Sequence, residues 1–175
     1  MARIPYFDLS QASPRLQQAI GSRPPLNIYR MVAHGGPCAE AFLSLGASLL
    51  RRNELDSQLR ELVILRVGIL SRASYEVHQH KRVARRLDVP DEKVAALHDG
   101  PEAPVFSEHE RRVLRYTDQV VLNVKSGDSQ FDELAQVLSH RELVELNLAI
   151  GYYMMVSRFL ENFEVDLEEP AQASV

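Results

Sequence analysis

Cysteine is almost absent from this chain, which contains a single one, Cys38, among 175 residues. One cysteine cannot form a disulfide within the chain, so the fold does not depend on an oxidising compartment. The first residues also lack the apolar run of a signal peptide. The most apolar stretch, residues 143–160, is interrupted by polar residues such as Glu145 and Arg158, which argues against a membrane span. We therefore expect a cytoplasmic protein with no membrane partner.

An excess of basic residues is missing too, because the formal net charge is −4 with histidine neutral. Surfaces that bind nucleic acid usually carry such an excess, so we expect no nucleic-acid partner. Basic residues do gather locally, at Lys81, Arg82, Arg85 and Arg86. On a helix they form either a solvated stripe or a grip for an anionic ligand, and the sequence leaves both readings open.

Strand-like alternation is also missing, and glycines and prolines separate helical patterns along the chain. The length favours one domain, which we expect to be all-α. Two segments, Asp56 to Leu70 and Ser139 to Phe163, are too apolar to face water and should be the most buried helices. Residues 143–160 are apolar on more sides than one small core can absorb, so we expect a homo-oligomer.

The residues best suited to chemistry lie between Glu61 and His80. Glu76 and His80 are four residues apart, so on a helix they share one face, where a carboxylate and an imidazole can share a proton. Tyr75 adds a phenol, and Glu61 offers a second carboxylate from the preceding helix. Two carboxylates near one imidazole raise its pKa while burial opposes this, and we expect the charges to win.

Two other kinds of site have less support. Glu61, Glu76 and His80 are metal-ligand types, but the His-Glu-x-x-His pattern is absent, and His78 points away from His80 on a helix. We therefore expect no metal and no cofactor. The sequence shows no base beside Cys38, so we expect this residue to be a small buried thiol and not a nucleophile.

The stretch from Glu61 to His80 resembles the carboxymuconolactone decarboxylase and alkylhydroperoxidase D family. The redox branch of that family reads Glu, eleven residues, Cys-x-x-Cys, three residues and His. Here Glu61 and His80 occupy the outer positions, while Ala73 and Glu76 stand in the two cysteine positions. The resemblance extends from about residue 26 to residue 167, and includes residues 26–34, 87–94 and 143–159.

This resemblance implies an orthogonal all-α helical bundle of the alkylhydroperoxidase D-like type. Members of the family form homo-oligomers through apolar helices, which agrees with the expectation from residues 143–160. On the same basis we expect an N-terminal arm over residues 1–25, the helical domain over residues 26–167, and a frayed tail over residues 168–175.

For function, the resemblance implies a decarboxylase-like lyase that acts on a small carboxylated molecule. His80 would be the general acid and base, Glu76 would orient it, Glu61 would tune its pKa and Tyr75 would complete the site. We expect Arg66 to bind a substrate carboxylate.

A second reading keeps the fold as a non-catalytic oligomeric scaffold, in which Glu61, Glu76 and His80 form a buried structural network. Family-level alkylhydroperoxidase (peroxiredoxin) activity is a third reading, which the missing cysteines disfavour. A pocket that contains Tyr75, Glu76 and His80 would favour the enzyme, whereas close packing around the same residues would favour the scaffold.

Overall fold

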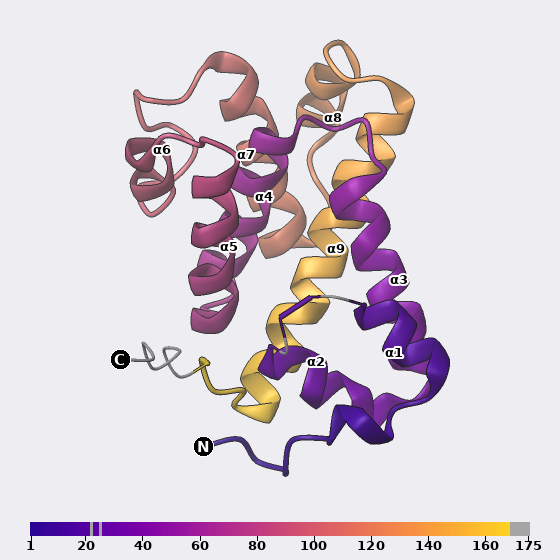
Figure 1. Ribbon diagram of the computed structural model, residues 1–175. Helices are drawn as coiled ribbons and strands as arrows, with labels where there is room; N and C mark the ends of the chain where they lie inside the picture. Colours follow the sequence, from indigo (N-terminus) through magenta and orange to yellow (C-terminus); the bar gives the residue numbers. More distant parts are fainter. Residues whose placement is uncertain (22, 25, 169–175) are drawn as a thin grey trace.

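The protein is all-helical, as the sequence predicts (Figure 1). The computed structural model describes residues 1–21, 23–24 and 26–168, and these ranges contain no strand. The predicted frayed tail therefore lies outside the described residues, apart from Glu168. Within the described ranges, no helix has the length and apolar character needed to cross a membrane. The helices in chain order are η1 (Leu9–Gln11), α1 (Pro14–Ile20), α2 (Asn27–Val32), η2 (Ala33–Gly35), α3 (Pro37–Arg51), α4 (Ser57–Leu70), α5 (Ser74–Arg86), α6 (Asp91–Ala96), α7 (Glu108–Asn123), α8 (Asp128–Ala135) and α9 (His140–Phe163).

Helix α4 lies at the centre of the fold, and its burial confirms the prediction for this segment. Asp56 caps the helix by accepting a hydrogen bond from the Leu59 N–H at 2.9 Å. Every residue from Leu59 to Gly68 is buried. Two hydrophobic clusters meet at α4, one containing Val63 and the other containing Leu62. A helix between two cores has no face left for water, which explains why its sequence is apolar on all sides.

Helix α9 is buried on one side only. It begins with a capping box in which Ser139 Oγ accepts a hydrogen bond from the Glu142 N–H at 3.1 Å. Val144, Leu148 and Met155 are 59%, 48% and 47% exposed, and their spacing places them along one stripe, called here the outer α9 stripe. After α4, helix α9 has the most buried residues among the described helices, as predicted. The expectation that none of it faces water is wrong, because the chain's own core covers only one face of α9.

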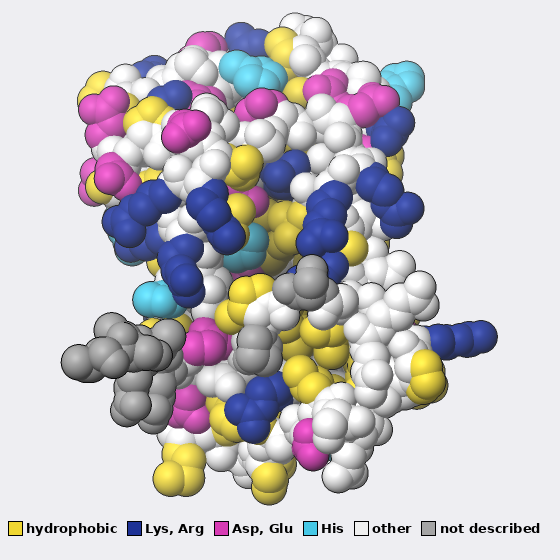
Figure 2. Space-filling model, in the orientation of Figure 1, with side chains coloured by type: hydrophobic (Ala, Val, Ile, Leu, Met, Phe, Trp, Pro, Cys, Tyr) yellow, Lys and Arg dark blue, Asp and Glu magenta, His cyan; other side chains and the backbone are white. Residues whose placement is uncertain are grey.

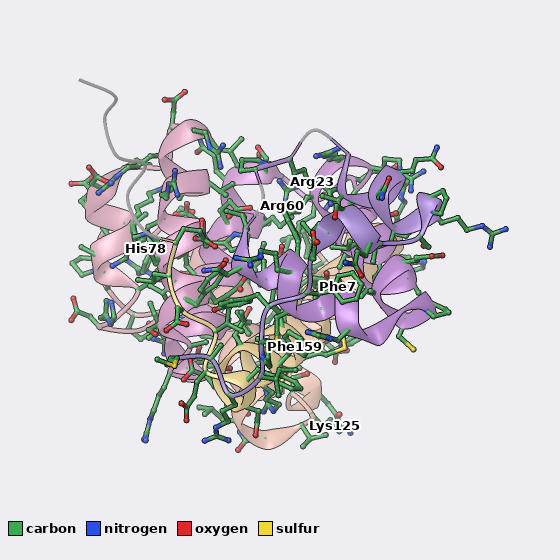
Figure 3. The ribbon with its side chains drawn as sticks, turned by 60° about the horizontal axis from the view of Figure 1, so that its bottom comes forward. Phe7, Arg23, Arg60, His78, Lys125 and Phe159 are labelled. Atoms are coloured by element: carbon green, nitrogen blue, oxygen red, sulfur yellow. The ribbon has the colours of Figure 1, made fainter. Side chains whose placement is uncertain are left out.

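The N-terminal segment packs against the rest of the protein (Figure 1). Helix α1 lies beside α3, where a third hydrophobic cluster joins them. Phe7 and Phe159 border this cluster, and Figure 3 shows them on neighbouring parts of the molecule. Arg3 forms an ion pair with Glu164 at 2.7 Å. The first residues of the chain therefore lie beside the segment that follows α9.

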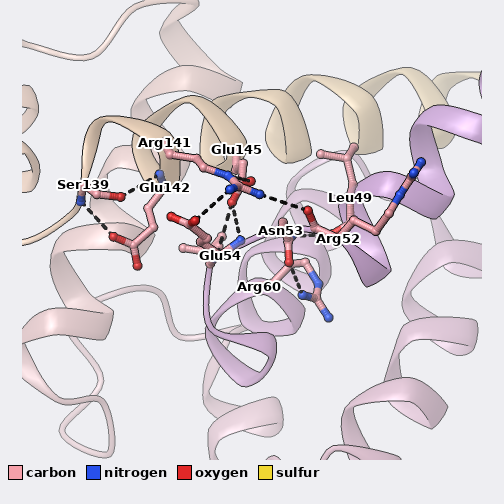
Figure 4. Close-up of polar contacts among 10 residues, drawn as sticks. Leu49, Arg52, Asn53, Glu54, Arg60, Ser139, Arg141, Glu142 and Glu145 are labelled. Carbon is pink, nitrogen blue, oxygen red and sulfur yellow. Dashed lines mark hydrogen bonds and ion pairs between the residues drawn. The ribbon is translucent and has the colours of Figure 1, made fainter.

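The connection between α3 and α4 is fixed to the first turns of α9 (Figure 4). Glu145 accepts a hydrogen bond from the Glu54 N–H at 2.6 Å. Arg141 donates to the Glu54 carboxylate at 2.7 Å, and Asn53 accepts a hydrogen bond from Arg60 at 3.0 Å. These contacts hold the residues that precede α4 against the start of α9, and Asn53 holds the side chain of Arg60.

Candidate functional site

A sharp turn between α4 and α5 brings the polar residues together. Arg72 has a positive φ of 56° in this turn. A Cβ atom at Gly68 would lie 3.0 Å from a methyl carbon of Val77, so glycine allows the start of α5 to pack closely on α4. Helix α5 therefore folds back along α4, and Glu61 meets His80 although the two are nineteen residues apart.

His80 is held between two carboxylates. Its Nδ1 atom lies 2.6 Å from Oε2 of Glu61, and its Nε2 atom lies 3.0 Å from Oε1 of Glu76. The three residues are 8%, 0% and 3% exposed in the order His80, Glu61 and Glu76. The predicted meeting of both carboxylates at one imidazole is confirmed. These three residues are called here the acid–base cluster.

The charges in this cluster decide the protonation of His80. Burial alone lowers the pKa of His80, but the charge of Glu76 and hydrogen bonds to Glu61 and Glu76 raise it to about 10. At neutral pH both ring nitrogens therefore carry a proton, and each N–H donates to one carboxylate. This agrees with the expectation that the carboxylates outweigh burial.

Arg60 adds a cation to the cluster that the sequence analysis missed. It precedes Glu61 on α4 and is 5% exposed, and its Nε atom lies 3.8 Å from Oε1 of Glu61. Both of these atoms are buried and have no hydrogen-bond partner among the described residues. The cluster therefore presents one donor and one acceptor that the described protein atoms do not use. A basic residue inside an apolar helix was the available signal for Arg60.

Tyr153 is a second neighbour that the sequence did not identify as part of the site. Its ring packs edge-on against the His80 imidazole, with the centroids 4.9 Å apart. Burial raises the pKa of the Tyr153 phenol, and the charges of Glu76 and Glu61 raise it further. Tyr153 therefore stays neutral and fills the space beside the imidazole.

Tyr75 makes its polar contacts on another face of α5. Its hydroxyl donates to Glu168 Oε1 at 2.5 Å and accepts a hydrogen bond from the Ile28 N–H at 3.4 Å. Gln79, one turn further along α5, donates to Glu168 Oε2 at 2.5 Å. Tyr75 and His80 are thus close in sequence but contact different partners, because five helical positions place them roughly 140° apart around α5.

Arg66 is not brought to the cluster. Its guanidinium forms two hydrogen bonds of 2.7 Å with the Asp118 carboxylate and a third of 2.5 Å with the Leu97 carbonyl. Five helical positions separate it from Glu61, which is roughly 140° around α4. The structure therefore gives Arg66 a different role from the one expected: it ties α4 to α7 and to the end of α6.

The exposure of two further residues, His78 and Cys38, can be compared with what the sequence predicts. His78 is exposed, and Figure 3 shows it on the outer side of α5, away from Arg60. Cys38 is exposed as well, so the expectation of a buried thiol is wrong. It lies in the first turn of α3, where the next residue, Ala39, takes the buried position at 0% exposure.

Two cavities lie away from the acid–base cluster. Two cavities of about 400 and 480 Å³ share Tyr116, Phe131 and Asn147 as lining residues, and no residue of the acid–base cluster lines either of them. Figure 2 shows a separate hollow bordered by α5 and α3, with hydrophobic side chains and a histidine inside and Lys and Arg on both sides. Within the part of the chain that the structure describes, no group of three potential ligands has the arrangement of a metal site.

The sequence matches the carboxymuconolactone decarboxylase family over residues 37–119. This range extends from α3 into α7 and includes the whole acid–base cluster. Over this range the chain is similar to the family, and with one cysteine it lacks the Cys-x-x-Cys pair, as its sequence predicts. A comparison with curated proteins gave no match.

Several solved structures share the fold. The alkylhydroperoxidase AhpD core of a peroxidase-related protein from Ralstonia eutropha JMP134 superposes with a TM-score of 0.85 at 14% identity, covering 96% of this chain and 93% of that chain. A peroxidase-related protein from Silicibacter sp. TM1040 gives 0.77 at 15% identity, with 95% and 94% covered. A variant of the debrominase Bmp8 in complex with 2,3,4-tribromopyrrole gives 0.73 at 18% identity, with 96% and 94% covered. These likenesses confirm the predicted bundle of the alkylhydroperoxidase D-like type.

Proposed function

We propose that this protein acts on a small carboxylated molecule by acid–base chemistry at the acid–base cluster. The observation that carries the proposal is the His80 imidazole held between two buried carboxylates, at 2.6 Å and 3.0 Å. The family domain supports the proposal, since it contains all three residues. The hollow with Lys and Arg on both sides (Figure 2) supports an anionic substrate.

The surroundings of the two imidazole protons give them different roles. The Nδ1–H group donates a hydrogen bond to Glu61, whose side chain is 0% exposed, so this bond fixes the orientation of the ring. The Nε2 proton is shared with Glu76, whose side chain is 5% exposed. A substrate that reaches Glu76 competes for this second proton. His80 then acts as the general acid and Glu76 orients it.

The experiment is a screen of small carboxylated lactones and oxo-acids for turnover. We expect the His80→Ala variant to lose about 10²- to 10⁴-fold in rate, the usual contribution of a general acid or base. Glu76→Gln should reduce the rate strongly, because the amide cannot hold the imidazolium by charge. His78→Ala is the matched control, since that histidine is exposed on the same helix. Equal turnover in the wild type and in His80→Ala would refute the proposal.

A non-catalytic scaffold is the second candidate. It is favoured by the burial of the whole cluster and by the position of the two cavities, which are lined by other residues. This candidate predicts that no lactone or oxo-acid is turned over, while His80→Ala and Glu76→Gln lower the free energy of unfolding. Circular dichroism during urea unfolding measures that change and separates it from a loss of catalysis.

A further inference from the structure

Glu168 is bound by a set of donors that suits any carboxylate. Its Oε1 atom accepts hydrogen bonds from the Asn27 N–H at 2.7 Å and from the Tyr75 hydroxyl at 2.5 Å. Its Oε2 atom accepts one from the Gln79 side-chain amide at 2.5 Å. Three donors from two separate elements thus converge on both oxygens of one carboxylate. We call these three donors the carboxylate cradle.

The structure holds the donors of the cradle in place. Tyr75 is 2% exposed, and its hydroxyl accepts a hydrogen bond from the Ile28 N–H at 3.4 Å, which leaves its own proton for the carboxylate. Burial raises the pKa of Tyr75, and the hydrogen bond to Glu168 raises it further, so the phenol remains a donor. Hydrogen bonds to an ionised carboxylate are roughly twice as strong as those between neutral groups.

The cradle lies beside the acid–base cluster. Tyr75 and Gln79 are one turn apart on α5, and Glu76 and His80 follow each of them by one residue. The two pairs therefore form adjacent stripes on the same turns of one helix, separated by roughly 100°. The cradle and the carboxylate of the acid–base cluster on α5, Glu76, therefore come from neighbouring positions of the same helix.

We propose that the carboxylate cradle is the binding subsite for the carboxylate of the substrate, and that Glu168 occupies it as an internal competitor. This inference rests on the proposed function and supplies the carboxylate-binding group that Arg66, bound to Asp118, does not provide. Glu168 follows the last residue of α9 by five positions and the buried Val165 by three. A carboxylate on so short a tether has an effective concentration on the order of millimolar, which a substrate can exceed.

Propionate is the direct probe, because it matches the end of a glutamate side chain, and propionamide is its neutral control. Binding is followed by ¹H–¹⁵N NMR at the Gln79 side-chain amide and at the Asn27 backbone amide. In Glu168→Ala we expect propionate to shift both signals and to bind about tenfold tighter than in the wild type, because the tethered competitor is gone. Glu133→Ala removes an exposed acid from α8 and should bind like the wild type.

Tyr75→Phe in the Glu168→Ala background removes one donor but keeps the ring. We expect it to weaken propionate binding about tenfold, the usual effect of losing a hydrogen bond to a charged group. The inference is overturned if propionate leaves the Gln79 and Asn27 signals unchanged in folded Glu168→Ala, or if propionamide binds equally well. In the wild-type protein, a high concentration of propionate should shift the same Gln79 and Asn27 signals without any substitution.

This test separates the inference from the function on which it rests. Turnover that depends on His80, together with no propionate binding at the cradle, would leave the acid–base role intact and remove the subsite. Propionate binding at the cradle together with turnover unaffected by His80→Ala would leave the subsite and remove the acid–base role.

Discussion

The acid–base cluster and the outer surface of α7, α8 and α9 are opposite in character. The cluster contains Glu61, Glu76 and His80, all below 10% exposed, in a hairpin between two hydrophobic cores. The outer surface contains both cavities, and its apolar residues are exposed, with Leu148 at 48% and Phe131 at 45%. The buried acid–base cluster and the exposed apolar surface therefore lie in different parts of this molecule.

The buried charged residues and the exposed apolar residues of this chain therefore need separate explanations. Buried ionised groups persist only when they are paired, so the cluster keeps its charge by holding its members together. An exposed apolar stripe on a long helix is typical of a surface that another protein covers. We therefore propose reactivity at the α4–α5 hairpin and self-association at the outer α9 stripe. Each of the following predictions tests one side of this contrast.

The largest effect is expected at Glu61. The Glu61→Ala substitution leaves a buried imidazolium with one carboxylate and removes the carboxylate that lies 3.8 Å from Arg60. Breaking a buried ion pair in this way lowers the free energy of unfolding by about 3–5 kcal/mol. Urea unfolding monitored by circular dichroism measures the change. Glu133→Ala is the control, for which a change within about 0.5 kcal/mol is expected at an exposed site. A similar small change in Glu61→Ala would contradict the assignment of a paired buried charge.

The next effect concerns self-association. The homo-oligomer remains a prediction, now with a specific surface. We expect Leu148→Glu to dissociate the assembly, because it introduces a charge at the middle of the outer α9 stripe. Sedimentation velocity at micromolar concentration measures the state. Gln18→Glu, on α1 at a distant exposed position, should leave it unchanged. A wild-type protein that is monomeric under these conditions would contradict the predicted self-association.

A smaller effect is expected from pH. The folded protein raises the pKa of His80 from 6.5 to about 10, so the stabilisation from its protonation is complete below pH 6.5 and is lost as the pH rises towards 10. Between these limits the folded state binds one more proton than the unfolded state, which lowers stability by up to about 1.4 kcal/mol per pH unit. We expect the difference in unfolding free energy between wild type and His80→Ala to narrow from pH 7 to pH 9. A difference that stays constant over this range would contradict the charge assignment.

The smallest effect is expected at Cys38. A peroxidatic thiolate needs a lowered pKa and a resolving thiol or reductant, and the family's cysteine positions hold Ala73 and Glu76. We expect no hydroperoxide turnover with an external thiol, and no difference between wild type and Cys38→Ser. Turnover in the wild type that disappears in Cys38→Ser would place redox chemistry at an exposed site outside the hairpin.

The sequence predicted the contacts that follow from helical spacing. Glu76 and His80 meet because they are four residues apart on one helix, and Glu61 joins them because a short turn folds α5 back along α4. The central burial of α4 also followed from its composition. These features depend on local periodicity and on one hairpin, both of which are visible in the chain.

The rest depends on directions and distant contacts that spacing does not fix. Arg66 points to Asp118 because it lies on another side of α4, and Cys38 is exposed because its neighbour Ala39 takes the buried position. Tyr75 binds Glu168, a residue 93 positions away, for which no local signal exists. One face of α9 is exposed because the core has too little area to cover the whole helix, although the helix is apolar enough to be buried.

The most direct test of the account is the titration of His80, followed by NMR of its ring nitrogens. We predict that His80 remains doubly protonated at neutral pH and titrates near pH 10. Glu76→Gln should lower the pKa of His80, because burial then opposes fewer favourable charges. A His80 that titrates near the ordinary imidazole value of about 6.5 would contradict the central claim that two buried carboxylates hold a charged imidazole.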